Sequence, residues 1–266
     1  MSMKKQQASE TGRANSKLRK IAKGVYAIWY REVKVFLREK SRLISALFMP
    51  LIWFFIFGEG IGSIASVPGN YNHFIFPGFL VMTIIFSSLF NGAYLVWDKK
   101  VDFLKGVLVS PLSRTTIFTG KVVGCMTDAV VQAMILLIVG IFLGIPFTFI
   151  SVILTIIMLF GLALGLVSLG LIIGSFMESP EGFGLVASFV VYPLFLLSGA
   201  LYPLENLPHW MQVVTHINPA TYAVDGLRSI IIHQSSMSYL SNLIIILGFD
   251  IILILIGTWA FNRMKL

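Results

Sequence analysis

The stretch from residue 129 to residue 177 reads AVVQAMILLIVGIFLGIPFTFISVILTIIMLFGLALGLVSLGLIIGSFM and has no charged side chain in 49 positions. A single helix of that length would measure about 74 Å at 1.5 Å per residue. The hydrocarbon core of a bilayer is only about 30 Å thick, so the stretch must fold back on itself. Gly144, Ile145 and Pro146 have the chemistry of a turn. We therefore predict a hairpin of two spanning helices, Val122–Ile145 and Ile150–Phe176.

The composition of the whole chain is that of a membrane protein. Of its 266 residues, 57% are hydrophobic and 12% are charged, whereas soluble chains average about 45–50% and about 25%. The mean hydropathy is +0.88. The single cysteine, Cys125, excludes a disulfide scaffold and a cysteine-ligated metal cluster within the chain. We expect an all-α integral membrane protein rather than a soluble domain.

Four more apolar stretches have the length of a helix, which brings the predicted number of transmembrane helices to six. We expect their boundaries to be accurate to a few residues. Residues 43–266 then form one six-helix transmembrane domain. The six predicted spans are Leu43–Phe57, Phe74–Trp97, Val122–Ile145, Ile150–Phe176, Phe183–Leu201 and Leu243–Phe261.

The N-terminal part is basic and has no apolar core of the kind that a signal peptide needs. We expect residues 1–20 to be a flexible cytoplasmic tail and residues 21–42 to be an amphipathic helix on the membrane surface. The alternatives are a solvated basic segment and a nucleic-acid-binding arm. Trp29 and Phe36 favour the membrane surface, so we expect no nucleic-acid partner. The apolar stripe of this helix comprises Ile21, Val25, Ile28, Trp29, Val33, Phe36 and Leu37.

The distribution of Lys and Arg predicts the orientation, because short loops rich in these residues stay in the cytoplasm. Twelve of the twenty lie within residues 1–42, five within residues 98–121 and two at the C-terminus. Arg228 is the exception, because it lies in the predicted external segment 202–242. We predict a multi-pass protein of the plasma membrane with both termini in the cytoplasm.

Sequence motifs for catalysis are missing from this chain. An ATP-binding GxxxxGK[ST] loop would need Ser or Thr after its lysine, but Val122 follows Gly120 and Lys121. A membrane serine hydrolase would need an activated serine, and Ser198-Gly199 lacks the glycine and the neighbouring histidine of such a site. We therefore expect neither an enzyme nor a resident cofactor, and no metal site. The histidines, which lack metal-ligand spacing, are His73, His209, His216 and His233.

Two carboxylates, Asp128 and Asp250, lie inside predicted spans. Charges at bilayer depth are costly and mark candidate functional sites. Either residue could belong to an ion-coupled secondary transporter, or could make a structural hydrogen bond between helices. Ion-coupled transporters often show an inverted repeat, and the sequence shows none.

An aromatic stripe follows one face of the second predicted span and a similar stripe follows the fifth. Either stripe could face lipid, pack against a neighbouring helix or line a substrate pathway. A pathway of this kind suits an amphipathic, lipid-linked or drug-like substrate better than a small ion. The candidate pathway residues are Phe79, Met82, Phe86 and Phe90 in the second span and Phe189, Tyr192 and Leu196 in the fifth.

Two connecting segments also carry apolar patterns. Val101, Leu104, Val107 and Leu108 are spaced as one face of a short amphipathic helix that Pro111 ends. Such a helix can contact a cytoplasmic partner or be an ordinary interfacial loop. The segment after the fifth span is too apolar for a free loop, so we expect short helices that re-enter the outer leaflet, the second at residues 219–232.

Several segments resemble the permease subunit of a type 2 ATP-binding-cassette exporter, near the daunorubicin-resistance and nodulation-factor export group. The resemblance runs from about residue 30 to residue 228. One departure is Lys100-Val101-Asp102, where many relatives have an acidic residue and a glycine. The matching segments are SGALYPLENLPHW at 198–210, NPATY at 218–222, DGLR at 225–228, WDKKVDFLKGVLVSPLSR at 97–114 with the continuation that ends at Gly120-Lys121, Arg31-Glu32, Arg38 and Pro50.

The resemblance implies an exporter that moves its substrate out of the cytoplasm with two copies of a separate ATPase, which would bind ATP and magnesium. It also implies a pair of permease chains, either a homodimer or a heterodimer with a sister permease. The resemblance further implies that the short amphipathic helix between the second and third spans is a coupling helix that docks in the ATPase. Its expected residues are Val101, Phe103, Leu104, Val107, Leu108, Pro111 and Arg114. The resemblance also implies that the external segment forms a cap over the outer exit of the pathway. Its expected residues are Pro203, Glu205, Pro208, Trp210, Asn218, Pro219, Asp225 and Arg228.

Overall fold

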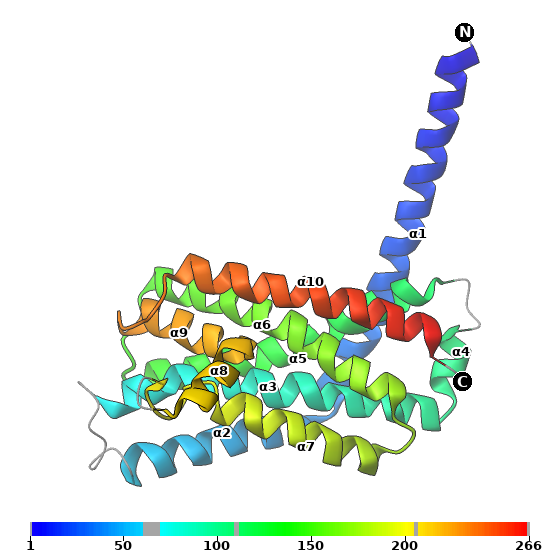
Figure 1. The fold of residues 1–266 in the computed structure, drawn as a ribbon. Helices are drawn as coiled ribbons and strands as arrows, with labels where there is room; N and C mark the ends of the chain where they lie inside the picture. Colours follow the sequence, from blue (N-terminus) through cyan, green and yellow to red (C-terminus); the bar gives the residue numbers. More distant parts are fainter. Residues whose placement is uncertain (1, 61–69, 109–111, 205–206, 265–266) are drawn as a thin grey trace.

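A computed structural model describes residues 2–60, 70–108, 112–204 and 207–264. Within these ranges the chain is helical and has no strand. Most of the longer helices lie side by side along one common direction, whereas α1 projects from the bundle (Figure 1). Their bounds are α1 Ser2–Arg38, α2 Lys40–Gly60, α3 Tyr71–Lys100, α4 Phe103–Leu108, α5 Arg114–Phe142, α6 Phe149–Phe176, α7 Pro180–Leu196, α8 His209–Ile217, α9 Pro219–Ile231 and α10 Tyr239–Arg263.

Four of the six predicted spans are helices long and apolar enough to cross a membrane, namely α3, α5, α6 and α10. The other two correspond to α2, whose apolar part is Leu47–Gly58, and to α7. Helix α7 has 17 residues, about 26 Å at 1.5 Å per residue. It ends five residues before the predicted boundary, because the chain turns at Gly199, whose φ is +75°. The chain is therefore membrane-spanning, whereas the count of six spans stays a prediction.

The predicted hairpin of α5 and α6 is confirmed. Helix α5 ends at Phe142, and Gly144 then adopts a φ of +81°, which glycine tolerates better than other residues. Thr148 and Ser151 form a capping box that starts α6. At its other end, α5 begins at Arg114, earlier than the predicted Val122, because Ser113 caps it. The loop before it is correspondingly shorter than expected.

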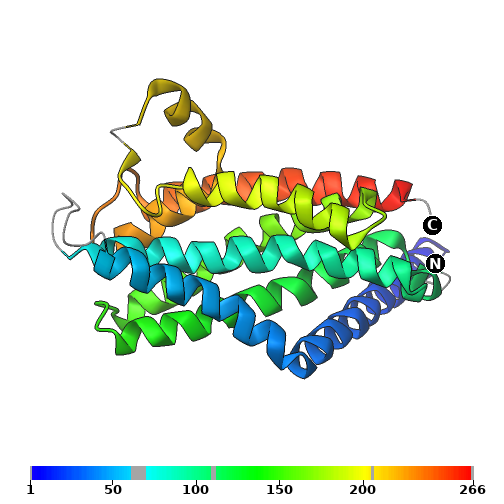
Figure 2. The same cartoon turned by 90° about the horizontal axis from the view of Figure 1, so that it is seen from below.

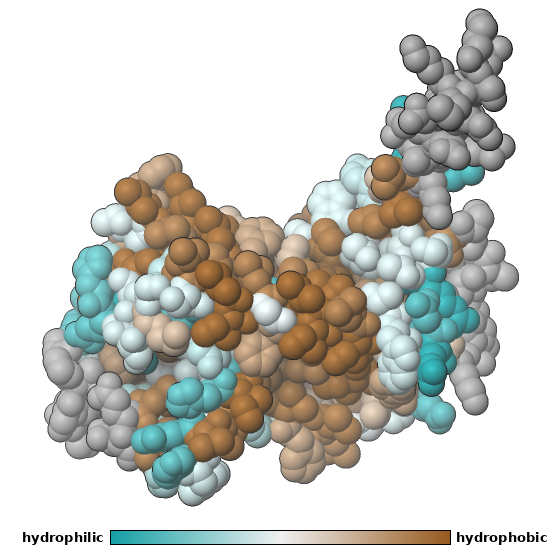
Figure 3. All heavy atoms as spheres, turned by 45° about the horizontal axis from the view of Figure 1, so that its top comes forward, coloured by the Kyte–Doolittle hydropathy of each residue, from teal (hydrophilic) through white to brown (hydrophobic). Residues whose placement is uncertain are grey.

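The bundle has two distinct ends, which we call the α4 end and the α8 end after the short helix at each. Helix α3 runs between them through the middle of the bundle and is mostly buried (Figure 2). Hydrophobic side chains cover the middle of the face drawn in Figure 3, and hydrophilic ones gather toward both ends. Helix α10 exposes apolar side chains, among them Ile251 and Leu255. This distribution is the one that a protein surrounded by lipid tails requires.

Glycines let the central helices approach closely. A side chain at Gly92 of α3 or at Gly170 and Gly174 of α6 would collide with the backbone of the opposite helix. Gly165 of α6 provides the same space for Asp250 of α10. The regular spacing of small residues in α6 is therefore used for packing inside one chain.

The N-terminal helix differs from the prediction in its bounds. It begins at Ser2 rather than at residue 21, and it ends at Arg38, where Glu39 separates it from α2 at an angle (Figure 2). Its apolar stripe packs on α5, where Gly120 lies against Ile28. Trp29 donates a hydrogen bond from Nε1 to Thr127 Oγ1 at 3.1 Å. Part of the stripe therefore covers another helix, whereas Ile21 and Leu37 are exposed. A position on the membrane surface stays a prediction.

Candidate functional site

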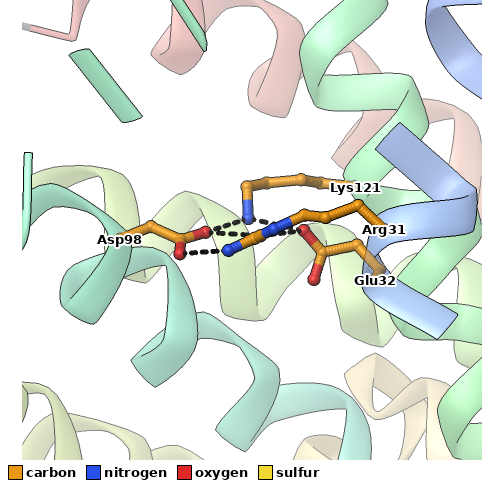
Figure 4. A network of polar contacts seen from close by, with 4 residues as sticks. All are labelled: Arg31, Glu32, Asp98 and Lys121. Carbon is orange, nitrogen blue, oxygen red and sulfur yellow. Dashed lines mark hydrogen bonds and ion pairs between the residues drawn. The ribbon is translucent and has the colours of Figure 1, made fainter. Parts of the chain in front are cut away.

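Four charged residues form a compact network at the α4 end (Figure 4). Arg31 and Glu32 come from α1, Asp98 from α3 and Lys121 from α5. Lys121 Nζ lies 3.0 Å from Glu32 Oε1 and 2.6 Å from Asp98 Oδ2. Arg31 contacts Glu32 at 2.7 Å and holds both oxygens of Asp98, at 2.8 Å and 3.1 Å. The two positive and two negative charges link three helices.

Burial makes this network sensitive to the loss of any member. Lys121 is 3% exposed, Glu32 7% and Asp98 8%. Charges removed from water are tolerated when they are paired and hydrogen-bonded. Burial alone would lower the pKa of Arg31, but its hydrogen bond to Asp98 and the charges of Glu32 and Asp98 outweigh burial and raise that pKa. The network is a neutral, fully paired cluster.

Close packing of α1 on α5 brings the network together. Gly124 lies directly against the Glu32 side chain, so a larger residue there would displace the carboxylate. One turn earlier, Gly120 lies against Ile28. These two glycines provide the groove in which α1 lies, and Lys121 directly follows Gly120. Lys121 is thereby placed between the acidic residues of two other helices.

The network continues to α4, the predicted coupling helix. The guanidinium carbon of Arg31 lies 3.9 Å from the centre of the Phe103 ring, close enough for a cation–π contact. A cavity of about 500 Å³ opens here between α1 and α4. Its lining includes Arg31, Phe103 and Lys121. The exposed surface of α4 is therefore in contact with the buried charges.

The predicted face of α4 needs correction. Leu104 is fully buried among Ile117, Phe118 and Phe261, so it anchors α4 to the bundle and cannot meet a partner directly. Val101 lies at the end of α3 rather than in α4, because Asp102 interrupts the helix with a φ of +56°. Val101 and Phe103 are exposed and stay candidate contacts. The side chains of Val107, Leu108 and Pro111 lie outside the described part of the structure.

Arg114 has a different position from the one expected for a coupling residue. Its Nη1 donates to the carbonyl oxygens of Phe261, Asn262 and Met264 at 3.2, 3.0 and 2.9 Å. These carbonyls end α10, where a cation is favourable. Lys99 similarly donates to Gly174 and other carbonyls at the end of α6. Cations thus bind the ends of two helices, α10 and α6, at the α4 end.

Arg228 of α9 is the central residue of the predicted outer cap. It is buried, and its Nε donates to Phe74 O at 3.1 Å. Its Nη2 donates to Gly199 O at 2.8 Å and to Ala200 O at 3.2 Å. The guanidinium carbon also lies 3.6 Å from the centre of the Phe74 ring. Arg228 therefore joins α9 to α3 and to the turn after α7.

The other predicted cap residues have separate positions. Asp225 accepts hydrogen bonds from the backbone of Ser236 and Met237 and from Asn242 Nδ2, at 2.8, 3.0 and 2.8 Å. Asn218 caps α9, and Pro219 is its first residue.

Helix α8 lies apart from the bundle (Figure 2), with Pro208 before it and Trp210 66% exposed. Pro203 is partly buried in the turn that precedes it. Glu205 lies outside the described residues. The two short helices of the predicted segment are present as α8 and α9, and their insertion into the outer leaflet stays a prediction.

The predicted aromatic stripe divides into two parts. Phe79 and Met82 are buried in the core of the chain and cannot line an open pathway in this conformation. Phe86 is partly buried; its ring centre lies 6.3 Å from that of Phe90 and 5.9 Å from that of Tyr192. The structure thus joins residues of the second and fifth predicted spans. The predicted pathway residues on α7 are all exposed, namely Phe189, Tyr192 and Leu196.

The two intramembrane carboxylates belong to different parts of the bundle. Asp250 is 2% exposed and lies against Gly165 of α6. The described residues include no ion-pair partner for Asp250. Asp128 is buried fourteen residues after the start of α5, which is deeper than the sequence predicted because α5 begins at Arg114. The packing of Asp250 against a glycine is consistent with a structural role.

Glu32, Asp98 and Lys121 lie in the segments that carry the family resemblance, but their sequence pattern predicted no role for them. Each is a charge near the end of a long apolar helix or of the helix that packs on it. That location is the signal that could have identified them, because charges there must be paired or reach water. Lys121 contributed only to the count of basic residues that predicts orientation, and that count does not indicate which acidic residues pair with it.

Comparison with known proteins identifies the family of the chain. The family described as ABC-2 type transporter matches residues 23–232. The ycf38 protein of Cyanophora paradoxa, named as a transport permease, is 31% identical over 243 residues, covering 82% of this chain and 83% of that protein. The inner membrane transport permease YadH of Escherichia coli K12 is 31% identical over 212 residues, covering 76% and 80%. YbhR of the same strain, named as a multidrug ABC transporter permease, is 31% identical over 176 residues, covering 65% and 47%.

Proposed function

The chain belongs to the ABC-2 type transporter family, and we propose that it is the permease of an ATP-driven exporter whose ATPase is a separate chain. Membership in the family implies a membrane transport permease that works with a partner ATPase. The export direction, the ATP coupling and the class of substrate are proposals. The observation that carries the coupling proposal is the contact of α4 with the buried charge network.

A mechanical route follows from these contacts. A partner that pushes on Phe103 moves the Arg31 guanidinium lying over its ring. Arg31 is bonded to Glu32 and Asp98, which share Lys121. Helices α1, α3 and α5 would then move together, because separating them would expose unpaired charges in a poorly hydrated site. Leu104 adds an apolar anchor on the same side of the bundle.

The experiment is co-purification with an ATPase encoded beside this chain, followed by ATPase assays in lipid nanodiscs. We expect Phe103→Ala to reduce substrate-stimulated ATPase activity at least fivefold while the permease stays folded. The matched control is Phe142→Ala, because Phe142 is 86% exposed at the opposite end of α5. Equal activity of the Phe103 variant and the wild type would refute the coupling role of α4.

The proposed substrate is amphipathic, lipid-linked or drug-like. Support comes from Phe86, Phe90 and Tyr192, which α3 and α7 bring together near an exposed apolar surface. We propose that a second permease chain, in a homodimer, covers this surface and completes the pathway, because two-fold pairing is the commonest assembly. Cross-linking through cysteines at position 189 tests the pairing, and a purely monomeric permease in the active complex would contradict it.

The proposed orientation has the α4 end in the cytoplasm, with both termini there. In a Cys125→Ala background, a cysteine at position 100 should react with a membrane-impermeant reagent only from the cytoplasmic side. A cysteine at position 206 should react only from outside. Labelling of position 100 from outside would reverse the topology.

The ion-coupled alternative depends on Asp250. Its carboxylate is buried without an ion-pair partner among the described residues. Transport by Asp250→Asn, driven by ATP in vesicles without an ion gradient, separates the two mechanisms. We expect transport to continue. Loss of transport, together with a requirement for an ion gradient in the wild type, would favour the secondary transporter.

A further inference from the structure

A cavity of about 410 Å³ opens between α2, α3 and α5, on the side of α3 that faces α2. This volume is within the range of sites for small organic ligands. Met49 and Pro50 of α2 and Phe86 and Phe90 of α3 form its apolar walls. Their shape and chemistry suit the apolar body of an amphiphile.

The inner wall has polar groups without partners. Gln132 of α5 is 1% exposed, and neither its Nε2 nor its Oε1 has a hydrogen-bond partner among the described residues. The buried Ser87 Oγ is also without one. Both residues line the cavity. Buried polar groups in folded proteins are nearly always hydrogen-bonded, so an amide and a hydroxyl left unpaired here point to a ligand that completes them.

A carboxylate lies in the same lining. Glu39 occupies the break between α1 and α2, and its Oε2 accepts a hydrogen bond from the Tyr94 hydroxyl at 3.1 Å. Tyr94 holds the carboxylate toward the cavity that both residues line. Within the described chain, Glu39 takes part in no ion pair. A half-buried carboxylate beside aromatic rings is a favourable environment for an organic cation.

We infer that this cavity binds a cationic amphiphile, with its positive group at Glu39 and its apolar body between Met49, Phe86 and Phe90. Polar groups on the ligand reach Gln132 and Ser87. This inference rests on the proposed function and names the charge class of its substrate. Phe86 connects the cavity to the proposed pathway, because its ring also packs on Tyr192 of α7.

The test uses two ions of nearly equal size and opposite charge, tetraphenylphosphonium and tetraphenylborate. Binding of each to the permease–ATPase complex in nanodiscs is measured by equilibrium dialysis, with empty nanodiscs subtracted. We expect saturable binding of the phosphonium and none of the borate. Equal saturable binding of both ions would overturn the inference, because it would show a site that reads only apolar shape.

Variants assign the binding to this cavity. Glu39→Gln keeps the size of the side chain and removes its charge, so it should raise the phosphonium Kd about tenfold. The matched control is Glu181→Gln, which removes the same charge from an exposed position in the first turn of α7. It should leave the Kd within about twofold. An unchanged Kd in a folded Glu39→Gln protein would refute the inference.

A second variant protects the test against misfolding. Gln132→Leu retains the bulk of the side chain and removes its amide, so its unfolding temperature should not fall. Because the phosphonium has no hydrogen-bonding group, Gln132→Leu should leave its Kd unchanged but weaken a hydroxyl-bearing aromatic ammonium probe about threefold. Equal binding of that probe by the wild type and Gln132→Leu would remove Gln132 from the site.

Other outcomes separate this inference from the proposed function. ATPase association and ATP-driven transport of an uncharged lipid, without phosphonium binding, would refute the inference and leave the exporter standing. Charge-selective binding by a permease that recruits no ATPase would support the cation site and refute the proposed exporter. A phospholipid retained equally by the wild type and Glu39→Gln in native mass spectrometry would show that an acyl chain occupies the cavity, and would overturn the inference.

Discussion

Two buried cations lie at opposite ends of the bundle and are stabilised by different partners. Lys121 at the α4 end is paired with Glu32 and Asp98. Arg228 at the α8 end is held by carbonyl oxygens and by the Phe74 ring. The first site is neutral and joins three helices through side chains. The second has no acidic partner in an ion pair among the described residues, and it joins α9 to the backbone of α3 and of the turn after α7.

The comparison shows how similar costs of burial lead to different mechanical properties. At the α4 end, side-chain ion pairs join α1, α3 and α5, so a movement of one of these helices is passed to the other two. At the α8 end, Arg228 holds backbone carbonyls of two segments, Phe74 in α3 and Gly199 and Ala200 after α7, so it fixes α9 against both. We therefore expect the α4 end to transmit movement and the α8 end to resist it.

The largest expected effect is on stability, from Lys121→Met. The substitution leaves Glu32 and Asp98 buried with Arg31 as their only partner in the network, and losing one member of a buried charge pair costs about 3–5 kcal/mol. Unfolding of the purified protein in an SDS titration measures this loss. The exposed Lys100→Met is the control and should change the free energy of unfolding by less than about 0.5 kcal/mol. Equal stability of the two variants would show that the network is not a buried cluster.

Arg228→Gln should have a smaller effect, about 2 kcal/mol, because the glutamine amide can retain one of the carbonyl contacts and leaves no charge unpaired. The same SDS titration measures it, with the exposed Arg19→Gln as control. If Arg228→Gln costs more than Lys121→Met, the carbonyl-held cation is the stronger restraint. The contrast drawn between the two ends would then be wrong.

Coupling energies distinguish the sites more sharply. Glu32→Gln and Lys121→Met remove two ends of one contact, so a double-mutant cycle should show a coupling of about 1–3 kcal/mol. Asp225 and Arg228 are three residues apart in α9 and interact through their charges, but the structure gives no hydrogen bond or ion pair between them. Their cycle, with Asp225→Asn and Arg228→Gln, should give less than about 0.5 kcal/mol. Similar couplings in both cycles would contradict the assignment of partners.

The smallest expected effect is that of Arg114→Gln. Arg114 holds the carbonyls at the end of α10, and a cation at a helix C-terminus contributes about 0.3–1 kcal/mol. Hydrogen exchange should accelerate in the last turn of α10 while the rest of the helix stays protected. Protection that stays unchanged there would show that α10 ends independently of α5.

Local pattern was sufficient for much of the architecture. The 49-residue uncharged stretch and its Gly-Pro turn predicted the α5–α6 hairpin, and the amphipathic spacing predicted a short helix before α5. Helix α9, predicted at residues 219–232, spans Pro219–Ile231. Each depends on periodicity and turn chemistry within a few residues, which the sequence displays directly.

The surroundings of the candidate site residues could not be predicted from the sequence, because they depend on contacts between distant segments. Leu104 has the spacing of an exposed face, but it is buried in a hydrophobic cluster with residues of other helices. Phe79 belongs to the same aromatic stripe as Phe86, yet it is enclosed by the core. Glu39 lies in a basic segment, where nothing in the local pattern shows that Tyr94 and a cavity face it. Periodicity identifies a face of a helix without identifying what packs against it.

The sequence by itself determined that the chain is helical, spans a membrane, folds back at Gly144 and resembles an ABC-2 permease, because hydrophobic length, turn residues and family motifs are local properties. Only the tertiary structure decided that Lys121 lies between Glu32 and Asp98, that Arg228 holds three backbone carbonyls and that a carboxylate, an unpaired amide and two phenylalanines line one cavity. The physical reason is that the energy of a buried polar group depends on its partners, and these come from helices far apart in the chain.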